Sequence, residues 1–243
     1  MVMAEATNHY FKHLGVSDGL SQVCIPSIYQ DELGAVWLGT TEGLNRYNGK
    51  DVKVFQPSES NHGLTNNEIN ELCGDKNGRM YIRSGNDLIK LDIYTEQFTC
   101  LRQKGVYGLF CKKDTLWVSC ADGIYYYTGQ GTELTFFARV QKGFVGRALY
   151  VDRETVWVVT RKYLVAISRE DPLRQEILLT LDKGNCILGD SSGNIWVGAW
   201  NGLYRVSPDR ETTAYVSHSG MGELSDNQVR CVLEDDCLFY TSP

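Results

Sequence analysis

Short apolar segments recur along the chain, separated by polar turns rich in Asp and Gly. Five large aromatic residues stand at equivalent points of this pattern, 36 to 44 residues apart, at Trp37, Tyr81, Trp117, Trp157 and Trp196. Seven positions after each of these anchors comes a large apolar residue, at Leu44, Leu88, Ile124, Leu164 and Leu203. A period of about 40 residues built of short strands is typical of a β-propeller blade.

Turn residues mark both sides of each anchor. An Asp precedes every anchor, at Asp31, Asp75, Asp114, Asp152 and Asp190, and a Gly stands one residue before the apolar slot in three copies, at Gly43, Gly123 and Gly202. Asp accepts hydrogen bonds from nearby backbone N–H groups and Gly adopts positive φ, so both favour tight turns between strands. Each unit therefore predicts four strands, of which the last lies near Phe55, Phe98, Phe136 or Tyr215.

The repeat predicts an all-β fold, a β-propeller of four-stranded antiparallel blades. One blade cannot bury both faces of its sheet, so the Trp and Leu slots are expected to form the core between blades. We expect five complete blades and a partial sixth, which begins near Leu224 and has its anchor at Phe239. Residues 1–9 are expected to be a leader and residues 10–243 the propeller segment, with a single outer strand at 10–14 and an incomplete ring.

Composition and charge disfavour several partners. The chain has 24 Lys and Arg against 30 Asp and Glu, a net charge of −6, and no basic cluster along the sequence, so nucleic acid is not an expected partner. No apolar run is long enough to cross a bilayer, and no membrane contact by this segment is expected. The eight cysteines form no Cys-x-x-Cys pair, so we expect neither a metal nor a cofactor. Four of them precede the turns and are expected to be small buried hydrophobes: Cys73, Cys111, Cys186 and Cys231.

The copy that spans residues 31–47 resembles the two-component regulator propeller repeat, and the copy that begins at residue 190 resembles it as well. The fixed slots of that repeat are filled at Asp31, Trp37, Gly43, Leu44 and Tyr47 in the first copy and at Asp190, Trp196, Gly202 and Leu203 in the second. The middle copies depart from it, with Tyr81 in the Trp slot and Arg83 and Val159 in a Gly slot.

Residues 11–21 also resemble the start of the mature sensor in hybrid two-component systems of Bacteroides-type bacteria. This resemblance implies a periplasmic sensor region without catalysis, whose relatives sense oligosaccharides and carry a histidine kinase beyond paired, usually seven-bladed propellers. It therefore implies an oligosaccharide as the ligand of this chain.

The turn after each anchor strand is the expected ligand-binding position, because it varies while its flanks do not. Trp200 is expected to stack on a sugar ring and Asn201 to hydrogen-bond its hydroxyls, while Arg83 and Arg161 suit an acidic sugar. The alternatives are that Trp200 packs on the loop of the next blade and that both arginines are solvated surface residues.

Two other functions stay open. A propeller with an incomplete ring is suited to protein interaction, through self-association or with further blades. The other alternative is a propeller glycosidase or polysaccharide lyase. Sialidases are such propellers, but the Asp-to-Trp spacing here is one residue longer on each side of the Gly than in their Asp-box and lacks its Thr. The four histidines show no Ser/His/Asp or metal-binding arrangement, so no catalytic residue is predicted.

Overall fold

The computed structural model describes residues 13–57, 63–102, 104–129, 131–217, 224–235 and 238–241. These residues form five four-stranded antiparallel sheets and one two-stranded sheet. Their helical content is two 3-10 turns, Val16–Asp18 and Gln141–Gly143, and no helix among them is long and apolar enough to span a membrane. The prediction of an all-β fold is confirmed.

Each sheet is one repeat unit, with its strands paired in chain order. The first contains β1 (Ser27–Gln30), β2 (Val36–Thr40), β3 (Gly43–Tyr47) and β4 (Val52–Phe55). The second contains β5 (Ile69–Gly74), β6 (Arg79–Ser84), β7 (Asp87–Asp92) and β8 (Gln97–Arg102). The third contains β9 (Val106–Lys112), β10 (Thr115–Cys120), β11 (Gly123–Tyr127) and β12 (Thr135–Ala138).

The fourth sheet contains β13 (Gly146–Val151), β14 (Thr155–Thr160), β15 (Tyr163–Ser168) and β16 (Gln175–Thr180). The fifth contains β17 (Cys186–Gly189), β18 (Ile195–Ala199), β19 (Gly202–Val206) and β20 (Thr212–Tyr215). The two-stranded sheet pairs β21 (Val232–Asp235) with β22 (Leu238–Thr241).

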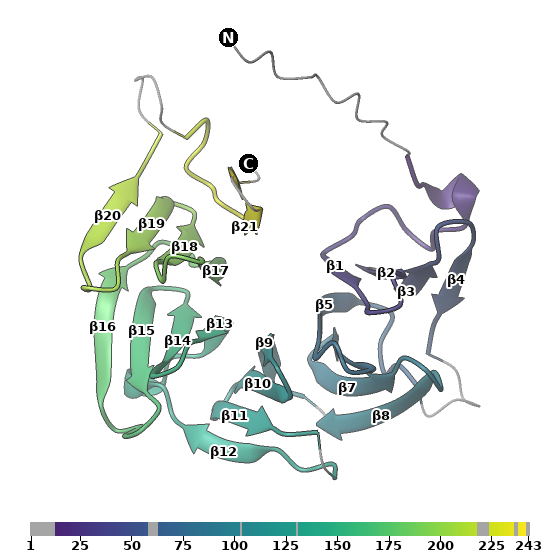
Figure 1. The fold of residues 1–243 in the computed structure, drawn as a ribbon, viewed down its shortest axis with the longest axis horizontal. Helices are drawn as coiled ribbons and strands as arrows, with labels where there is room; N and C mark the ends of the chain where they lie inside the picture. Colours follow the sequence, from purple (N-terminus) through teal and green to yellow (C-terminus); the bar gives the residue numbers. More distant parts are fainter. Residues whose placement is uncertain are drawn as a thin grey trace.

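The blades are arranged in an arc (Figure 1). Their first strands, β1, β5, β9, β13 and β17, face the centre, and the last strand of each blade lies on the outside. Successive first strands contact one another. The arc is open between the first blade and β21, as the incomplete repeat predicts. The strand predicted at 10–14 falls mainly outside the described residues, and His13 and Leu14, which are described, are not in a strand.

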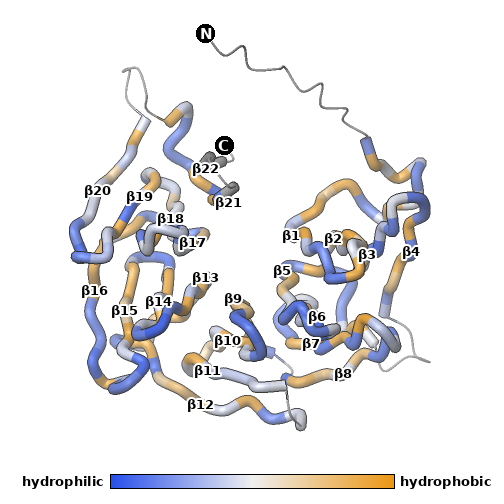
Figure 2. The backbone as a smooth tube through the Cα atoms, in the orientation of Figure 1, coloured by the Kyte–Doolittle hydropathy of each residue, from blue (hydrophilic) through white to orange (hydrophobic). Residues whose placement is uncertain are grey.

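The core lies between blades. All five anchors stand on the second strand of their blade, and each is at most 9% exposed. Trp37, for example, shares a cluster with Ile69 and Met80 of the next blade. Hydrophobic positions fall along the strands and hydrophilic ones in many of the turns between them (Figure 2). The predicted role of the Trp and Leu slots is confirmed.

A buried hydrogen-bond bridge fixes the turn before the anchor. The Asp31 side chain accepts hydrogen bonds from the backbone N–H groups of Leu33 and Ala35 at 3.0 and 2.8 Å. Its other oxygen accepts one from the Trp37 indole at 2.7 Å. The same Asp-to-Trp bridge recurs at 2.6 Å for Asp152 and Trp157 and at 2.8 Å for Asp190 and Trp196. The turn and the inter-blade core are thus held by one carboxylate.

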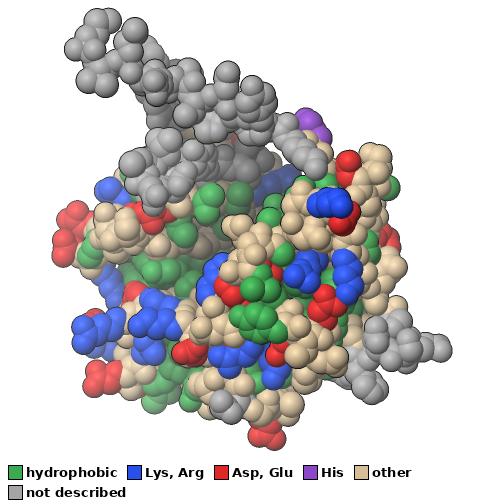
Figure 3. Space-filling model, turned by 45° about the vertical axis from the view of Figure 1, so that its right-hand side comes forward, with side chains coloured by type: hydrophobic (Ala, Val, Ile, Leu, Met, Phe, Trp, Pro, Cys, Tyr) green, Lys and Arg blue, Asp and Glu red, His purple; other side chains and the backbone are tan. Residues whose placement is uncertain are grey.

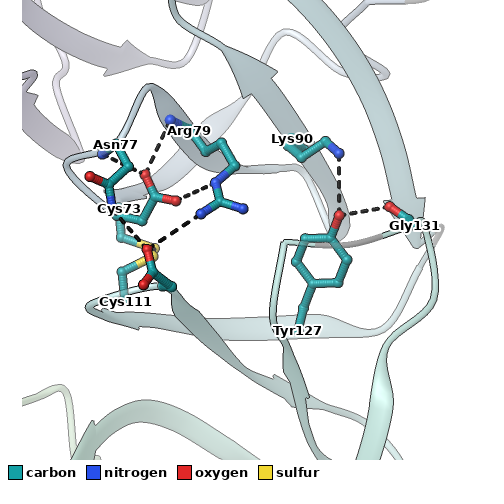
Figure 4. A network of polar contacts seen from close by, with 9 residues as sticks. Cys73, Asn77, Arg79, Lys90, Cys111, Tyr127 and Gly131 are labelled. Carbon is teal, nitrogen blue, oxygen red and sulfur yellow. Dashed lines mark hydrogen bonds and ion pairs between the residues drawn. The ribbon is translucent and has the colours of Figure 1, made fainter.

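Blades two and three replace the bridge, and blade two keeps the turn held by its Asp side chain (Figure 4). Where Tyr81 stands in the Trp slot, the Asp75 carboxylate accepts a hydrogen bond from Arg79 Nε instead. In blade three Asp114 is exposed, and Asn77 Nδ2 donates to it at 2.7 Å across the boundary between the two blades. Blade two therefore replaces the bridge with another contact inside its own turn, whereas in blade three the Asp side chain contacts the neighbouring blade.

The expectation that the four pre-turn cysteines are buried is wrong. Cys231 is exposed, and Cys73, Cys111 and Cys186 are half-buried. The first strands border the centre of the arc, where burial is incomplete: all four residues of β17 are half-buried. Cys73 Sγ and Cys111 Sγ lie 3.0 Å apart between the first strands of blades two and three.

The outer surface mixes both signs of charge. On the face shown in Figure 3, Lys and Arg side chains are interspersed with Asp and Glu. This distribution agrees with the small excess of acidic residues in the whole chain.

Candidate functional site

One face of the propeller collects two kinds of loop. Strands alternate in direction within a blade, so the turn between its second and third strands lies at the same end as the connection to the next blade. Arg161 and Lys162 form such a turn between β14 and β15, and Trp200 and Asn201 form one between β18 and β19. The connection 181–185 leads from β16 to β17 and passes between these two turns.

Backbone hydrogen bonds hold the connection to the turn of blade four. Leu181 N–H donates to the Lys162 carbonyl at 2.7 Å, and Gly184 N–H donates to the Arg161 carbonyl at 3.2 Å. Gly184 is required by the close approach, because a Cβ there would lie 2.5 Å from the carbonyl oxygen of Thr160. The loop is therefore fixed in place before any ligand binds.

The same connection is bonded to the turn of blade five. Trp200 N–H donates to the Asp182 carbonyl at 2.9 Å, and Asp182 N–H donates to Asn201 Oδ1 at 3.0 Å. The Asn201 amide oxygen thus has a structural partner. Asn185 N–H donates to the Gly198 carbonyl at 2.9 Å and anchors the end of the connection.

Three cavities open along this face. One of about 250 Å³ is lined by Arg147, Arg161, Lys183 and Trp200. Another, of about 380 Å³, is lined by Arg147, Arg161 and the aromatic ring of Phe144. The third, of about 660 Å³, is lined by Arg161 and Lys183. Because Arg161 lines all three, they adjoin and form one hollowed surface, which we call the Arg161 face.

Trp200 stands at the edge of this surface. Its side chain is 41% exposed, and Lys183 Nζ lies 3.4 Å from the centre of its ring. The indole contacts the connection that enters its own blade, and part of it is open to solvent. Trp200 and Arg161, which the sequence places in equivalent turns of consecutive blades, line the same cavity.

Arg83 lies elsewhere, in blade two. Its Nε lies 3.3 Å from Glu71 Oε2, and both side chains are partly exposed. Burial raises the pKa of Glu71 to about 7, even though the charge of Arg83 and a hydrogen bond from it lower that pKa. Arg83 is thus part of an ion pair, and a role for it in ligand binding stays a prediction.

Sequence reasoning missed Arg147 and Lys183. Both lie in or beside connections between blades, whose lengths vary, so they occupy no slot of the repeat. The sequence could have pointed to these residues because each connection between blades passes next to the turns of the blades on either side of it. Among the described residues, no group of three or more His, Cys, Asp or Glu is placed to hold a metal ion.

Comparison with known proteins gives partial matches. No family model matches the chain. Over 53 residues it is 40% identical to histidine kinase P4 of Formosa agariphila, which covers 22% of this chain and 4% of that kinase. In structure, it is similar to the extracellular domain of a hybrid two-component system from B. thetaiotaomicron, with 18% identity and a TM-score of 0.57. That match covers 92% of this chain and 39% of the larger domain.

A virginiamycin B lyase from Staphylococcus aureus is similar as well, with 11% identity, a TM-score of 0.67 and coverage of 90% of this chain and 84% of the lyase. The chain is a β-propeller. At these identities the likeness shows the fold alone, and propellers of this shape include both sensor domains and an enzyme. The resemblance to extracellular domains of Bacteroides hybrid two-component systems, inferred from the repeat, is confirmed at the level of this fold.

Proposed function

We propose that this propeller is the extracytoplasmic ligand-sensing region of a two-component regulatory system and that its ligand is an oligosaccharide. The match to histidine kinase P4 is the observation that carries the proposal, because it is a match in sequence. The fold alone is shared with a lyase and does not separate the two functions. The extracytoplasmic location rests on the structural neighbours, which are extracellular domains.

The part assigned to the propeller is binding, not catalysis. The Arg161 face offers what an oligosaccharide site needs: a partly exposed indole at Trp200, cationic donors and the side-chain amide of Asn185. A ligand held there changes the populations of two arrangements of the receptor only if it binds them unequally. The propeller supplies a rigid, hydrogen-bonded face for the ligand, and the unequal affinity then comes from contacts that the rest of the receptor makes in only one arrangement.

Screening by thermal unfolding tests the proposal. The purified chain is heated alone and with members of a panel of neutral and acidic oligosaccharides at increasing concentration. Binding to the folded state alone raises the melting temperature with ligand concentration, by mass action. We expect at least one oligosaccharide to do so. If millimolar concentrations of every oligosaccharide leave the melting temperature unchanged, the proposed ligand class is wrong.

A further inference from the structure

The turns of the ligand-binding face differ in charge from blade to blade. The turns after the second strand carry Glu42 in blade one and Asp122 in blade three, and in blade two Asp87 directly follows that turn as the first residue of β7. The corresponding turn of blade four carries two adjacent cations, Arg161 and Lys162. The turn of blade four is therefore basic where the turns of blades one and three contain a carboxylate, in a chain whose net charge is −6.

Connections add further positive charge to blade four. Four cations line the three adjoining cavities, and they come from the start of β13, from one turn and from one connection: Arg147, Arg161, Lys162 and Lys183. Asp182 lines the third cavity, and no other described Asp or Glu lines any of the three. Within the described part of the chain, no carboxylate lies within ion-pair distance of these four side chains. Among the residues that the structure describes, the Arg161 face thus carries an excess of positive charge.

Several described arginines pair with a carboxylate, whereas the Arg161 face gathers cations without such a pair around shared cavities. Arg46, Arg79, Arg83, Arg102 and Arg210 each pair with a carboxylate. Uncompensated cations beside one another repel, so their cluster is a cost to the free protein unless an anion binds there. The hydrogen bonds of the 181–185 connection hold this arrangement in place, which reduces the entropy lost on binding.

We propose that the Arg161 face binds an anionic oligosaccharide, a chain of sugar rings that bear carboxylate or sulfate groups. Arg161, at the junction of the three cavities, receives one anionic group through its planar pair of donors. Lys183 and Arg147 contact the groups on neighbouring sugars, and Trp200 lies beside a ring. This inference rests on the proposed sensing function for the carbohydrate nature of the ligand, while the requirement for negative charge rests on the cations alone.

Isothermal titration with a matched set of sugars tests the inference. The probes are hexagalacturonate, a chondroitin sulfate hexasaccharide and neutral cellohexaose, each titrated into the intact chain. We expect one of the acidic probes to bind and cellohexaose to bind at least about ten-fold more weakly, since one lost charged contact is worth about that factor. Binding is expected to weaken as salt is added, because Arg147, Arg161 and Lys162 are exposed.

Single substitutions locate the site. Arg161→Gln and Lys183→Gln are each expected to weaken binding of the acidic probe about ten-fold. The matched control is Arg153→Gln, which removes an exposed cation from the turn between β13 and β14, at the opposite end of the same blade. It is expected to leave affinity unchanged. Equal loss in all three variants overturns the proposed location.

Fluorescence quenching gives a second readout that needs no sugar. Trp200 is 41% exposed and the other four tryptophans at most 9%, so a quencher in solution reports mainly on Trp200. Iodide is expected to quench it better than caesium, and Arg161→Gln to reduce that preference. If iodide shows no preference, or if cellohexaose binds as well as the acidic probes, the inference fails and the sensing proposal stands. If no oligosaccharide binds at all, both fail.

Discussion

Replacing Asp31 tests whether the Asp-to-Trp bridge holds the blades together. The side chain is 4% exposed and accepts three hydrogen bonds, from two backbone N–H groups and the fully buried Trp37 indole. Asp31→Ala leaves these donors without their acceptor, and an unsatisfied buried donor costs about 1–3 kcal/mol. Because small shifts and water recover part of the loss, we expect the free energy of unfolding to fall by about 3 kcal/mol.

Asp31→Asn tests how much the Asp-to-Trp bridge contributes to stability separately from the turn. The remaining carbonyl oxygen of Asn still accepts from the backbone, but its NH₂ group faces the indole N–H, so one contact becomes a pair of donors. We expect a loss of about 2 kcal/mol, most of which disappears in a Trp37→Phe background, where no indole N–H is present. Urea unfolding followed by far-ultraviolet circular dichroism measures all four members of this cycle without relying on tryptophan fluorescence.

Asp114 provides the matched control for Asp31. It occupies the same slot in blade three, but its side chain is 68% exposed and is bonded to Asn77 and Arg79. Contacts of exposed charges contribute about 0.2–1 kcal/mol, so Asp114→Ala is expected to cost less than about 1 kcal/mol. Equal small losses for Asp31→Ala and Asp114→Ala would refute the view that the bridge, and not merely the turn, stabilises the blade.

Three further outcomes follow from the geometry. Gly184→Ala places a Cβ against the Thr160 carbonyl, so it is expected to displace the connection and weaken binding of the acidic oligosaccharide, as calorimetry would show. Burial raises the pKa of Asp190, but hydrogen bonds outweigh burial and lower the pKa below that of a free Asp. The ionised side chain therefore stabilises the fold above about pH 4, and this stabilisation is lost as the pH falls through the lowered folded pKa. Asp190→Asn is expected to flatten that part of a pH series of urea midpoints. A mild disulfide oxidant is expected to join Cys73 to Cys111 before any other pair, since these sulfurs are already adjacent, and peptide mapping by mass spectrometry identifies the product; a different linkage formed first contradicts this.

The sequence predicts the propeller because its core repeats. A buried anchor and the Leu seven residues later must fill the same space in each blade, so Trp37 and Leu44 recur as Trp196 and Leu203. The Asp turns recur for the same reason. Where the anchor is Tyr81, the repeat does not predict the partner of Asp75, and the structure shows that this partner is Arg79.

The candidate site could be predicted only in part. Arg161 and Trp200 could be predicted because both lie in the variable turn after an anchor strand, and the structure places both on one cavity. Arg147 and Lys183 were not, since connections between blades follow no fixed spacing. Arg83 was chosen by the same reasoning as Arg161, but a register shift between Ile69 and Glu71 sets Glu71 opposite Arg83, and no spacing rule foresees such a bulge.

Hydrogen exchange with and without the acidic oligosaccharide tests the central claim most directly, because it shows where on the propeller the ligand is held. The account predicts slower exchange at residues 161–162, 181–185 and 200–201 in the complex, and unchanged exchange at the Asp turns on the opposite face. Protection confined to that opposite face, or no protection at saturating ligand, would contradict it.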